Sequence, residues 1–167
     1  MFGTNGAGLM IRIHAQQRAG GESRLAGIQM AILTLRCMEH YREVAGDHHS
    51  ALVLLAVVAI SSERLTRGEL AEKWRSLDAP ISPEQLGTCN ISSIAVATGF
   101  NRETTRRYVN RLVERGILQR GPEGTIQFTA GYVQGDDIAQ LLQLQLDTLG
   151  RSVTEFLRIG AMVMVDD

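Results

Sequence analysis

Six arginines in the segment from residue 90 to 129 are the side chains with the clearest chemical potential. They are Arg102, Arg106, Arg107, Arg111, Arg115 and Arg120. The segment holds three glutamates and no lysine, so its net charge is +3. The planar guanidinium fork of arginine matches a phosphate group or the edge of a guanine, which the single ammonium group of lysine does not. This composition favours a polyanion such as DNA as the binding partner.

The remainder of the chain lacks this basic excess. Residues 1–89 carry nine basic and nine acidic side chains, residues 130–167 carry two basic and six acidic ones, and the whole chain has a formal net charge of −1. A polyanion responds to the local field rather than to the sum over the chain. We therefore expect the binding surface within residues 90–129.

The residues after Asn101 have the pattern of an amphipathic helix that runs from Arg102 to about Arg115. Asn101 favours the N-cap position, and Gly116 ends the helix. Some side chains recur at helical spacing and are expected to pack inward. They are Thr105, Tyr108 or Val109, and Leu112, and their expected contacts are Leu54, Val58 and Ile94.

The opposite face of this helix holds the candidate DNA contacts. A major groove accepts one α-helix, whose first turns lie nearest the base edges. The candidates for base or near-base contact are Asn101, Arg102, Glu103, Thr104 and Arg106. Asn110 also points outward, Arg107 and Arg111 are expected along the phosphates, and Arg120 is expected at the flanking backbone or minor groove. The alternative is an ordinary solvated helical face.

A short helix and a hairpin flank this segment. Residues 91–98 predict a helix with small side chains on one side, and Gly99 supplies the tight turn that follows. Residues 117–119 and 125–129 have strand character, and the glycine-bearing turn at residues 120–124 joins them into a hairpin. Helix, turn, helix and hairpin, in this order, predict a winged helix-turn-helix.

The run IAVATGFNRETTRRYVNRLVERGIL, from Ile94 to Leu118, resembles the winged helix-turn-helix of MarR-like and GntR-like bacterial transcription regulators. The residues in the slots of that pattern are Gly99, Phe100, Arg102, Thr104, Arg107, Leu112, Gly116 and Ile117. Asn101 replaces the usual serine cap, and Thr105 replaces the usual buried valine. The resemblance implies binding of double-stranded DNA and dimers joined through terminal helices. It also leaves room for an unidentified small-molecule effector, to which no residue is assigned.

The C-terminal tail carries an apolar seam. Its members are Leu142, Leu146, Leu149, Val153, Phe156, Gly160 and Val163. Alternating steps of four and three residues are typical of helices that pack together, and the chain has few other elements to cover so broad a face. We expect a second copy to cover the seam, which gives a homodimer that reads a pseudo-palindromic site. The alternative is a tail that folds back onto its own domain.

The expected fold class is mainly α with a small β-hairpin wing, and the chain divides into four parts. They are a glycine-rich flexible arm at residues 1–22, a packing or dimerisation helix at 23–46, the winged helix-turn-helix at 47–132 and a C-terminal dimerisation helix at 133–167. Residues 48–65 are apolar almost all round, which predicts a central buried helix. Residues 69–77 predict a further short helix.

Other chemistries have weaker support. One group of side chains near two predicted helix ends matches no zinc-ligand spacing: His40, His48, His49, Cys37 and Asp47. No catalytic set can be argued from spacing, so we expect neither a cofactor nor an enzymatic activity.

The longest apolar run, Ala51–Ile60, has ten residues, whereas a membrane span needs about twenty. Because Cys37 and Cys89 are the only cysteines, we expect ordinary thiols and a reducing, cytoplasmic location.

Together these features predict a dimeric, sequence-specific DNA-binding transcriptional regulator, expected to repress by occupying promoter DNA. Two alternatives remain open: a winged-helix module that docks a protein, and a DNA-binding component of a replication or mobile-element system. Salt-dependent binding to duplex DNA would exclude the protein-docking alternative, because it reports release of counterions from neutralised phosphates. A short palindromic site upstream of a gene would favour the regulator.

Overall fold

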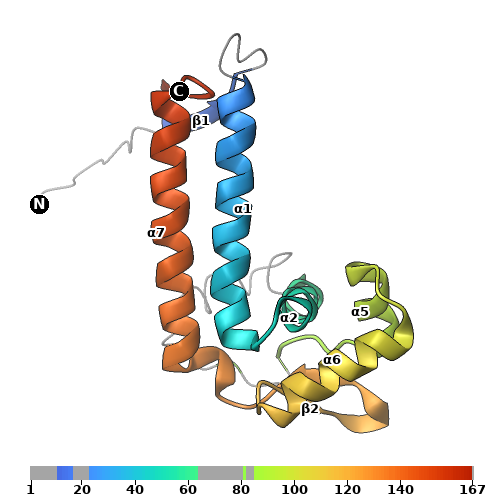
Figure 1. Cartoon of the computed structure of the whole chain (residues 1–167). Coiled ribbons are helices and arrows are strands. Elements are labelled where there is room, and N and C mark those ends of the chain that lie inside the picture. Colours follow the sequence, from blue (N-terminus) through green and yellow to red (C-terminus); the bar gives the residue numbers. More distant parts are fainter. Residues whose placement is uncertain (1–10, 17–22, 64–80, 82–84, 167) are drawn as a thin grey trace, which may run out of the picture. The chain divides into compact units, whose positions relative to one another are not determined.

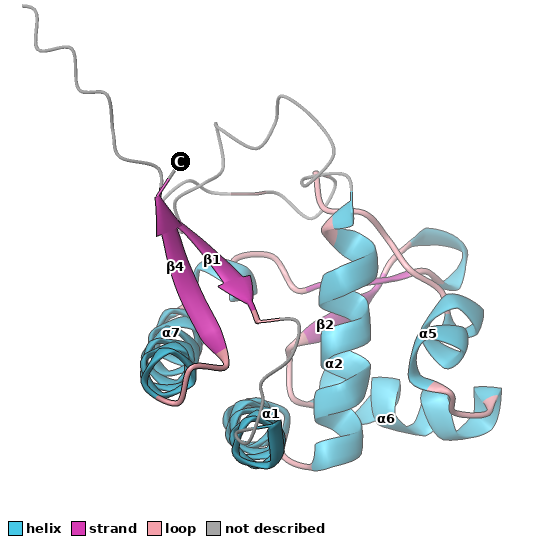
Figure 2. Ribbon diagram, turned by 90° about the horizontal axis from the view of Figure 1, so that it is seen from above, coloured by secondary structure: helices cyan, strands magenta, loops and turns pink. Residues whose placement is uncertain are grey.

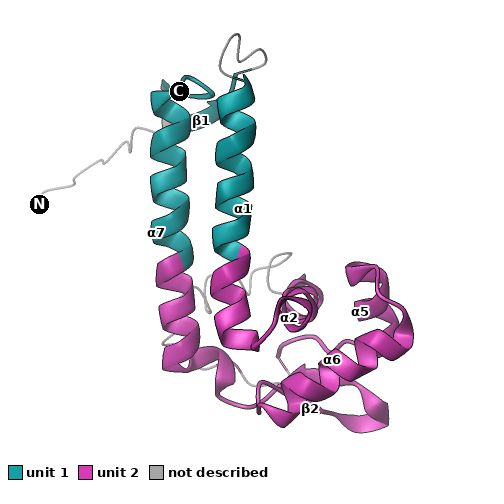
Figure 3. Cartoon of the chain, viewed as in Figure 1, with its two compact units in different colours: residues 1–37, 145–167 teal, residues 38–144 magenta. Residues whose placement is uncertain are grey.

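A computed structural model describes residues 11–16, 23–63, 81 and 85–166 of the chain. Most of these residues are helical, with two small pairs of antiparallel strands (Figure 1). The chain divides into two compact units, one made of residues 1–37 with 145–167 and the other of residues 38–144 (Figure 3). The mainly α class with a small hairpin is therefore confirmed.

The helix α2 (His48–Ser61) is the central helix of the unit formed by residues 38–144. It begins after Asp47, whose side chain accepts hydrogen bonds from the backbone N–H groups of the next turn. Because α2 is apolar all round, it has no polar face to turn to solvent, and Leu54 and Val57 are fully buried. This confirms the predicted buried helix. Val58 was wrongly expected in the core: it lies on the flank of α2 and is 37% exposed.

Two further helices, α5 (Ile91–Thr98) and α6 (Arg102–Glu114), lie where the sequence predicts them. Asn90 and Ser93 form a capping box at the start of α5, and the backbone turns at Gly99, where φ is +73° and any larger residue would be strained. Asn101 caps α6 by accepting a hydrogen bond from the backbone N–H of Thr104 at 2.8 Å. The inner face of α6 is buried as predicted, at Thr105, Tyr108, Val109 and Leu112.

The strands β2 (Leu118–Arg120) and β3 (Ile126–Phe128) form the predicted hairpin, each beginning one residue later than expected. They pair antiparallel, with Leu118 opposite Phe128. A short 3-10 turn, Pro122–Gly124, joins them. Cys89 adds an isolated bridge to Ile126, which fixes the segment before α5 against the hairpin.

The other unit is built on two long helices, α1 (Ser23–Ala45) and α7 (Asp136–Arg158), of which it holds the parts within residues 23–37 and 145–158. These parts run antiparallel and side by side (Figures 1 and 2). The side chain of Gln145 donates a hydrogen bond to the backbone carbonyl of Cys37 at 3.1 Å. Few apolar side chains of this unit are buried, and Phe156 is the largest of them.

The prediction of one C-terminal helix over residues 133–167 is wrong at its end. α7 stops at Arg158 because Gly160 adopts the left-handed conformation with a φ of +70°. The backbone N–H groups of Gly160 and Ala161 bond back to Leu157 and Phe156, which is the Schellman arrangement that ends a helix. Gly160 and Val163 therefore belong to no helical seam.

Residues Met162–Asp166 form the strand β4, which pairs antiparallel with β1 (Ile11–Ala15) (Figure 2). Ile13 lies opposite Met164. The expected flexible arm is therefore wrong for Ile11–Ala15: its alternating side chains suit a strand, and β4 supplies the partner that a single strand needs. Residues 1–10 and 17–22 of that arm, and the helix predicted at residues 69–77, lie outside the described residues.

Candidate nucleic-acid interface

The nine predicted DNA contacts all belong to the unit of residues 38–144, at the start of α6, along it and at the end of β2. Eight of them are exposed: Asn101, Arg102, Glu103, Arg106, Arg107, Asn110, Arg111 and Arg120. Thr104 is half-buried. Because the inner face of α6 packs in the core, the predicted side chains of residues 101–111 lie on its outer side, and Arg120 of β2 joins them through its hydrogen bond to Asn110.

Two arginines of this surface donate hydrogen bonds to other side chains of α6. Arg106 donates to the carboxylate of Glu103, with 2.7 Å between Nη1 and Oε2. Arg107 donates to the hydroxyl oxygen of Tyr108 at 3.2 Å, and its guanidinium lies 4.9 Å from the centre of that ring. An ion pair exposed to solvent contributes little free energy, so Arg106 can exchange Glu103 for another anion at small cost.

The hairpin reaches α6 through a polar contact. Arg120, the last residue of β2, donates to the side-chain oxygen of Asn110 at 2.6 Å. The two residues come from different elements, and both are predicted DNA contacts. Their hydrogen bond places the guanidinium of Arg120 beside the outer face of α6.

Two residues at the start of α2 also border this surface, and the sequence did not single them out for it. Asp47 accepts a hydrogen bond from Arg111, with 3.2 Å between Nη1 and Oδ2. The ring of His49 stacks on that of Tyr108, with centroids 5.1 Å apart and planes inclined by 7°. Asp47 is the N-cap of α2, and no local pattern in the sequence signals a contact between residues so far apart in the chain.

The carboxylate of Asp47 is held in place by its own helix. Oδ1 accepts from the backbone N–H groups of His49 and Ser50, both at 3.0 Å, and Oδ2 accepts from the hydroxyl of Ser50 at 2.7 Å. Partial burial raises the pKa of Asp47, but the hydrogen bonds from Ser50, His49 and Arg111 outweigh it, so the pKa lies below its ordinary value. Asp47 is therefore a fixed negative charge at the edge of a basic surface.

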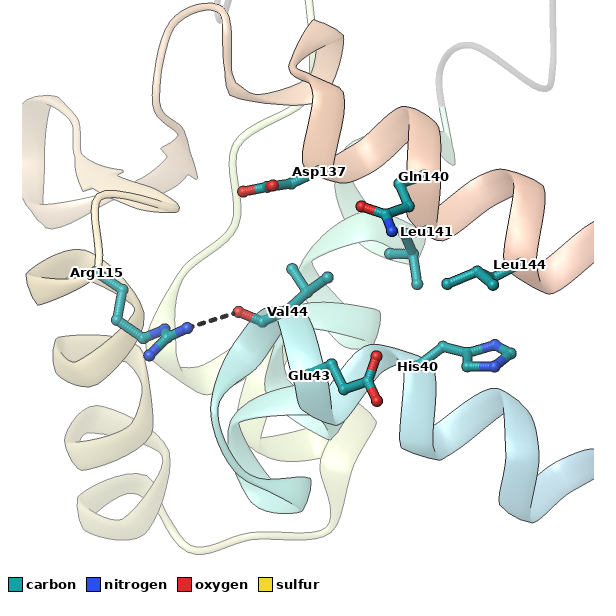
Figure 4. Close-up of a pocket in the computed structure, with 8 residues that line it drawn as sticks. All are labelled: His40, Glu43, Val44, Arg115, Asp137, Gln140, Leu141 and Leu144. Atoms are coloured by element: carbon teal, nitrogen blue, oxygen red, sulfur yellow. Dashed lines mark hydrogen bonds between the residues drawn. The ribbon is translucent and has the colours of Figure 1, made fainter.

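Arg115, the sixth arginine of the basic segment, has a structural contact. Its guanidinium donates to the backbone carbonyl of Val44 at 3.0 Å (Figure 4). It also lies against Gly46, where an added Cβ would come within 3.1 Å of Nη1 and where φ is +94°. The glycine at this turn lets the guanidinium approach the backbone closely.

A pocket of about 230 Å³ lies next to Arg115 (Figure 4). It is lined by His40, Glu43, Val44, Arg115, Asp137, Gln140, Leu141 and Leu144. In the part of the chain that the structure describes, Nδ1 of His40 is buried without a hydrogen-bond partner. The small-molecule effector stays a prediction.

The predicted dimerisation residues divide into two groups. Leu142, Leu146 and Leu149 of α7 are 44%, 53% and 47% exposed. Phe156 is 3% exposed, so it packs within its own chain and was wrongly placed on a surface seam; Val153 is half-buried. The buried side chains of α7 are Leu141, Thr148, Ser152 and Phe156, and the first three of these each precede a predicted seam residue by one position.

The unit of residues 1–37 and 145–167 exposes an unusual amount of apolar surface. Among the residues that the structure describes, thirteen large apolar side chains are exposed, and ten of them belong to this unit: Ile13, Leu25, Ile28, Met30, Ile32, Leu35, Leu146, Leu149, Met164 and Val165. Between Leu25 and Leu35, α1 carries no charged residue. Where exposed apolar side chains form a contiguous patch, that patch commonly marks an interaction site.

Two other features bear on function. Within the described ranges, no three His, Cys, Asp or Glu side chains gather as metal ligands would. No single described helix has the length and apolar character to span a membrane, although the bent pair of α1 and α2 meets the same criteria of length and composition.

Comparison with known proteins yields no relative. No family model, no curated protein and no solved structure matches this chain.

Proposed function

We propose that this protein is a dimeric, sequence-specific DNA-binding transcriptional regulator with a winged helix-turn-helix. The observation that carries the proposal is the outer face of α6, where four exposed arginines stand on a helix that the core fixes in place. They are Arg102, Arg106, Arg107 and Arg111. The order α5, turn, α6 and hairpin supports the proposal, and so does the position of Arg120 beside Asn110.

In this proposal α6 enters the major groove with its first turns toward the bases. Asn101, Arg102, Glu103, Thr104 and Arg106 contact bases or lie near them, while Arg107, Arg111 and Arg120 lie toward the phosphates. Asn101 is already committed to the cap of α6, so its amide nitrogen is the part left to meet DNA. Arg106 forms an exposed ion pair with Glu103, so it contacts a guanine only after its guanidinium leaves that carboxylate.

The dimer in the proposal is supported by the apolar surface of α1 and α7. Leu25, Ile28, Ile32 and Leu35 follow one another at steps of three and four residues on α1, and all are exposed. Leu146 and Leu149 continue the same kind of spacing on α7. Helices with such spacing pack against helices, and a second copy supplies them. Regulation then follows from occupation of promoter DNA by the dimer, which blocks transcription sterically.

The experiment that tests the proposal is selection of bound sequences from a pool of random duplexes. The expected result is an inverted repeat with half-sites about one helical turn apart, which a twofold dimer would read. Affinity for the selected duplex should fall steeply with salt. Failure to bind any duplex at low salt would contradict the proposal and favour a protein-docking role for the same surface. Binding without any sequence enrichment would instead favour a component that coats or positions DNA.

A further inference from the structure

The guanidinium of Arg111, on α6, donates a hydrogen bond to the carboxylate of Asp47, at the start of α2 in the same unit. The hydrogen bond of 3.2 Å joins the outer face of α6 to the first turn of α2, and the two side chains are 50% and 36% exposed. The guanidinium also lies 5.1 Å from the centre of the Tyr108 ring. Arg111 is therefore positioned by two contacts, of which only the one with Asp47 competes directly for the charge that a phosphate would use.

The carboxylate of Asp47 has hydrogen-bond partners that do not depend on Arg111. Three hydrogen bonds from His49 and Ser50 hold it at the start of α2, independently of α6. A DNA phosphate that approaches Arg111 thus meets a fixed negative charge that already occupies the guanidinium. The exchange leaves the carboxylate without its arginine and close to the phosphate, and both effects weaken binding.

We propose that Asp47 competes intramolecularly with the DNA phosphate for Arg111 and so lowers the affinity of α6 for duplex DNA. This inference rests on the proposed function. Tyr108 keeps the guanidinium at the surface in both states, so Arg111 changes partner without a change in the fold. Because non-specific binding depends almost entirely on phosphate contacts, the competition limits binding to unrelated sequences.

The variant Asp47→Asn isolates the charge, because asparagine caps a helix as well as aspartate does. Binding of a fluorescent duplex of random sequence is measured by anisotropy over a series of salt concentrations. Asp47→Asn should bind more tightly than the wild type, by up to about fivefold, the equivalent of one exposed ion pair. Its logarithmic salt dependence should be steeper by about 0.9, which is the release of one further counterion.

Arg111→Ala and the double variant Asp47→Asn/Arg111→Ala complete a double-mutant cycle for this pair of residues. If Asp47 acts through Arg111, the gain from Asp47→Asn disappears when Arg111 is absent. Glu155→Gln is the matched control, because it removes one carboxylate from the ion pair with Arg158 on α7 and should leave DNA binding unchanged. Asp47→Ser, a second capping residue without charge, should reproduce Asp47→Asn.

Three outcomes would overturn the inference. Asp47→Asn and Asp47→Ser could bind like the wild type, or the gain could persist without Arg111, which would make it a general charge effect. If the wild type and every variant fail to bind duplex DNA while remaining folded by circular dichroism, the proposed function itself is contradicted, and the inference falls with it. The first two results leave the proposed function standing.

Discussion

His49 lies flat against Tyr108, with 5.1 Å between ring centroids and 7° between ring planes. Phe100 completes the cluster, 5.5 Å from His49 and 6.0 Å from Tyr108. These rings join the first turn of α2, the turn before α6 and the middle of α6. These ring contacts therefore help to fix the orientation of the helix that carries the arginines.

Replacing His49 should destabilise the fold modestly. His49→Ala removes the stacked ring, and such a pair contributes about 0.5–1.5 kcal/mol. The free energy of unfolding, measured with urea, should fall by that amount. His48→Ala is the matched control, because the side chain of His48 is 54% exposed and its pair with Glu39 is open to solvent, so its loss should have little effect. Equal losses in the two variants would contradict a structural role for the ring pair.

The lowered pKa of Asp47 predicts a specific dependence of stability on pH. Partial burial opposes the shift, and the hydrogen bonds from Ser50, His49 and Arg111 cause it. Since the folded pKa lies below the unfolded value of about 3.9, the stabilisation is present above that pH and is lost as the pH falls through the folded pKa. Asp47→Asn should therefore show a flatter decline of unfolding free energy in acid than the wild type. Parallel declines would contradict this assignment.

Arg106 is expected to read a base. On the selected site, Arg106→Ala should cost about 1–3 kcal/mol of binding free energy and relax the preference at one position. The lost pair with Glu103 is exposed and should hardly affect stability. Competition assays with single-base variants of the site measure both effects. An equal loss on every sequence would make Arg106 a phosphate contact instead.

Leu149 is expected to lie in the dimer interface. Leu149→Asp should convert the dimer into a monomer, as measured by sedimentation velocity, because a carboxylate cannot be buried there without a partner. The side chain is 47% exposed in the single chain, so the monomer itself should remain folded. Thr154→Asp, on the same helix at an exposed position, is the control and should remain dimeric. An unchanged mass for Leu149→Asp would contradict the interface.

The thiol of Cys89 should be unreactive in the folded protein. Burial raises the pKa of Cys89 to about 11, and the side chain is 4% exposed. In a Cys37→Ser background, Cys89 should react with a disulfide reagent at pH 8 only as fast as the protein unfolds, because thiolate and access are both lacking. Addition of urea should make Cys89 react quickly, because unfolding exposes its thiol. Fast labelling of Cys89 in the folded protein would contradict its place in the core.

Much of the fold could be predicted because its signals are local. The cap at Asn101, the turn at Gly99 and the apolar spacing of α6 each act within a few residues and place α5 and α6, and the glycine-bearing turn places the hairpin to within one residue. The end of α7 was missed because Gly160 fits heptad spacing as well as it fits a C-terminal turn. The strand β1 is not predicted because alternation over five residues is a weak signal, and its partner β4 comes from the other end of the sequence.

In the candidate site, too, the sequence predicts what local signals determine and misses the contacts between separate elements. The outward residues of α6 follow from helical periodicity, which is local. The contacts of Arg111 with Asp47 and of Arg120 with Asn110 depend on how separate elements meet, and no spacing in the sequence encodes them. The same limit explains Phe156, which shares the heptad pattern of Leu149 but turns toward its own chain.

DNA binding by the outer face of α6 is tested most directly by comparing two double variants, whose binding to duplex DNA is measured by fluorescence anisotropy. Arg106→Ala/Arg107→Ala removes two arginines from α6, and Arg151→Ala/Arg158→Ala removes the same charge from α7. The wild type and the α7 variant should bind duplex DNA with a steep salt dependence, whereas the α6 variant should not bind. Equal binding by the two variants, or no binding by the wild type at low salt, would contradict DNA binding by the outer face of α6.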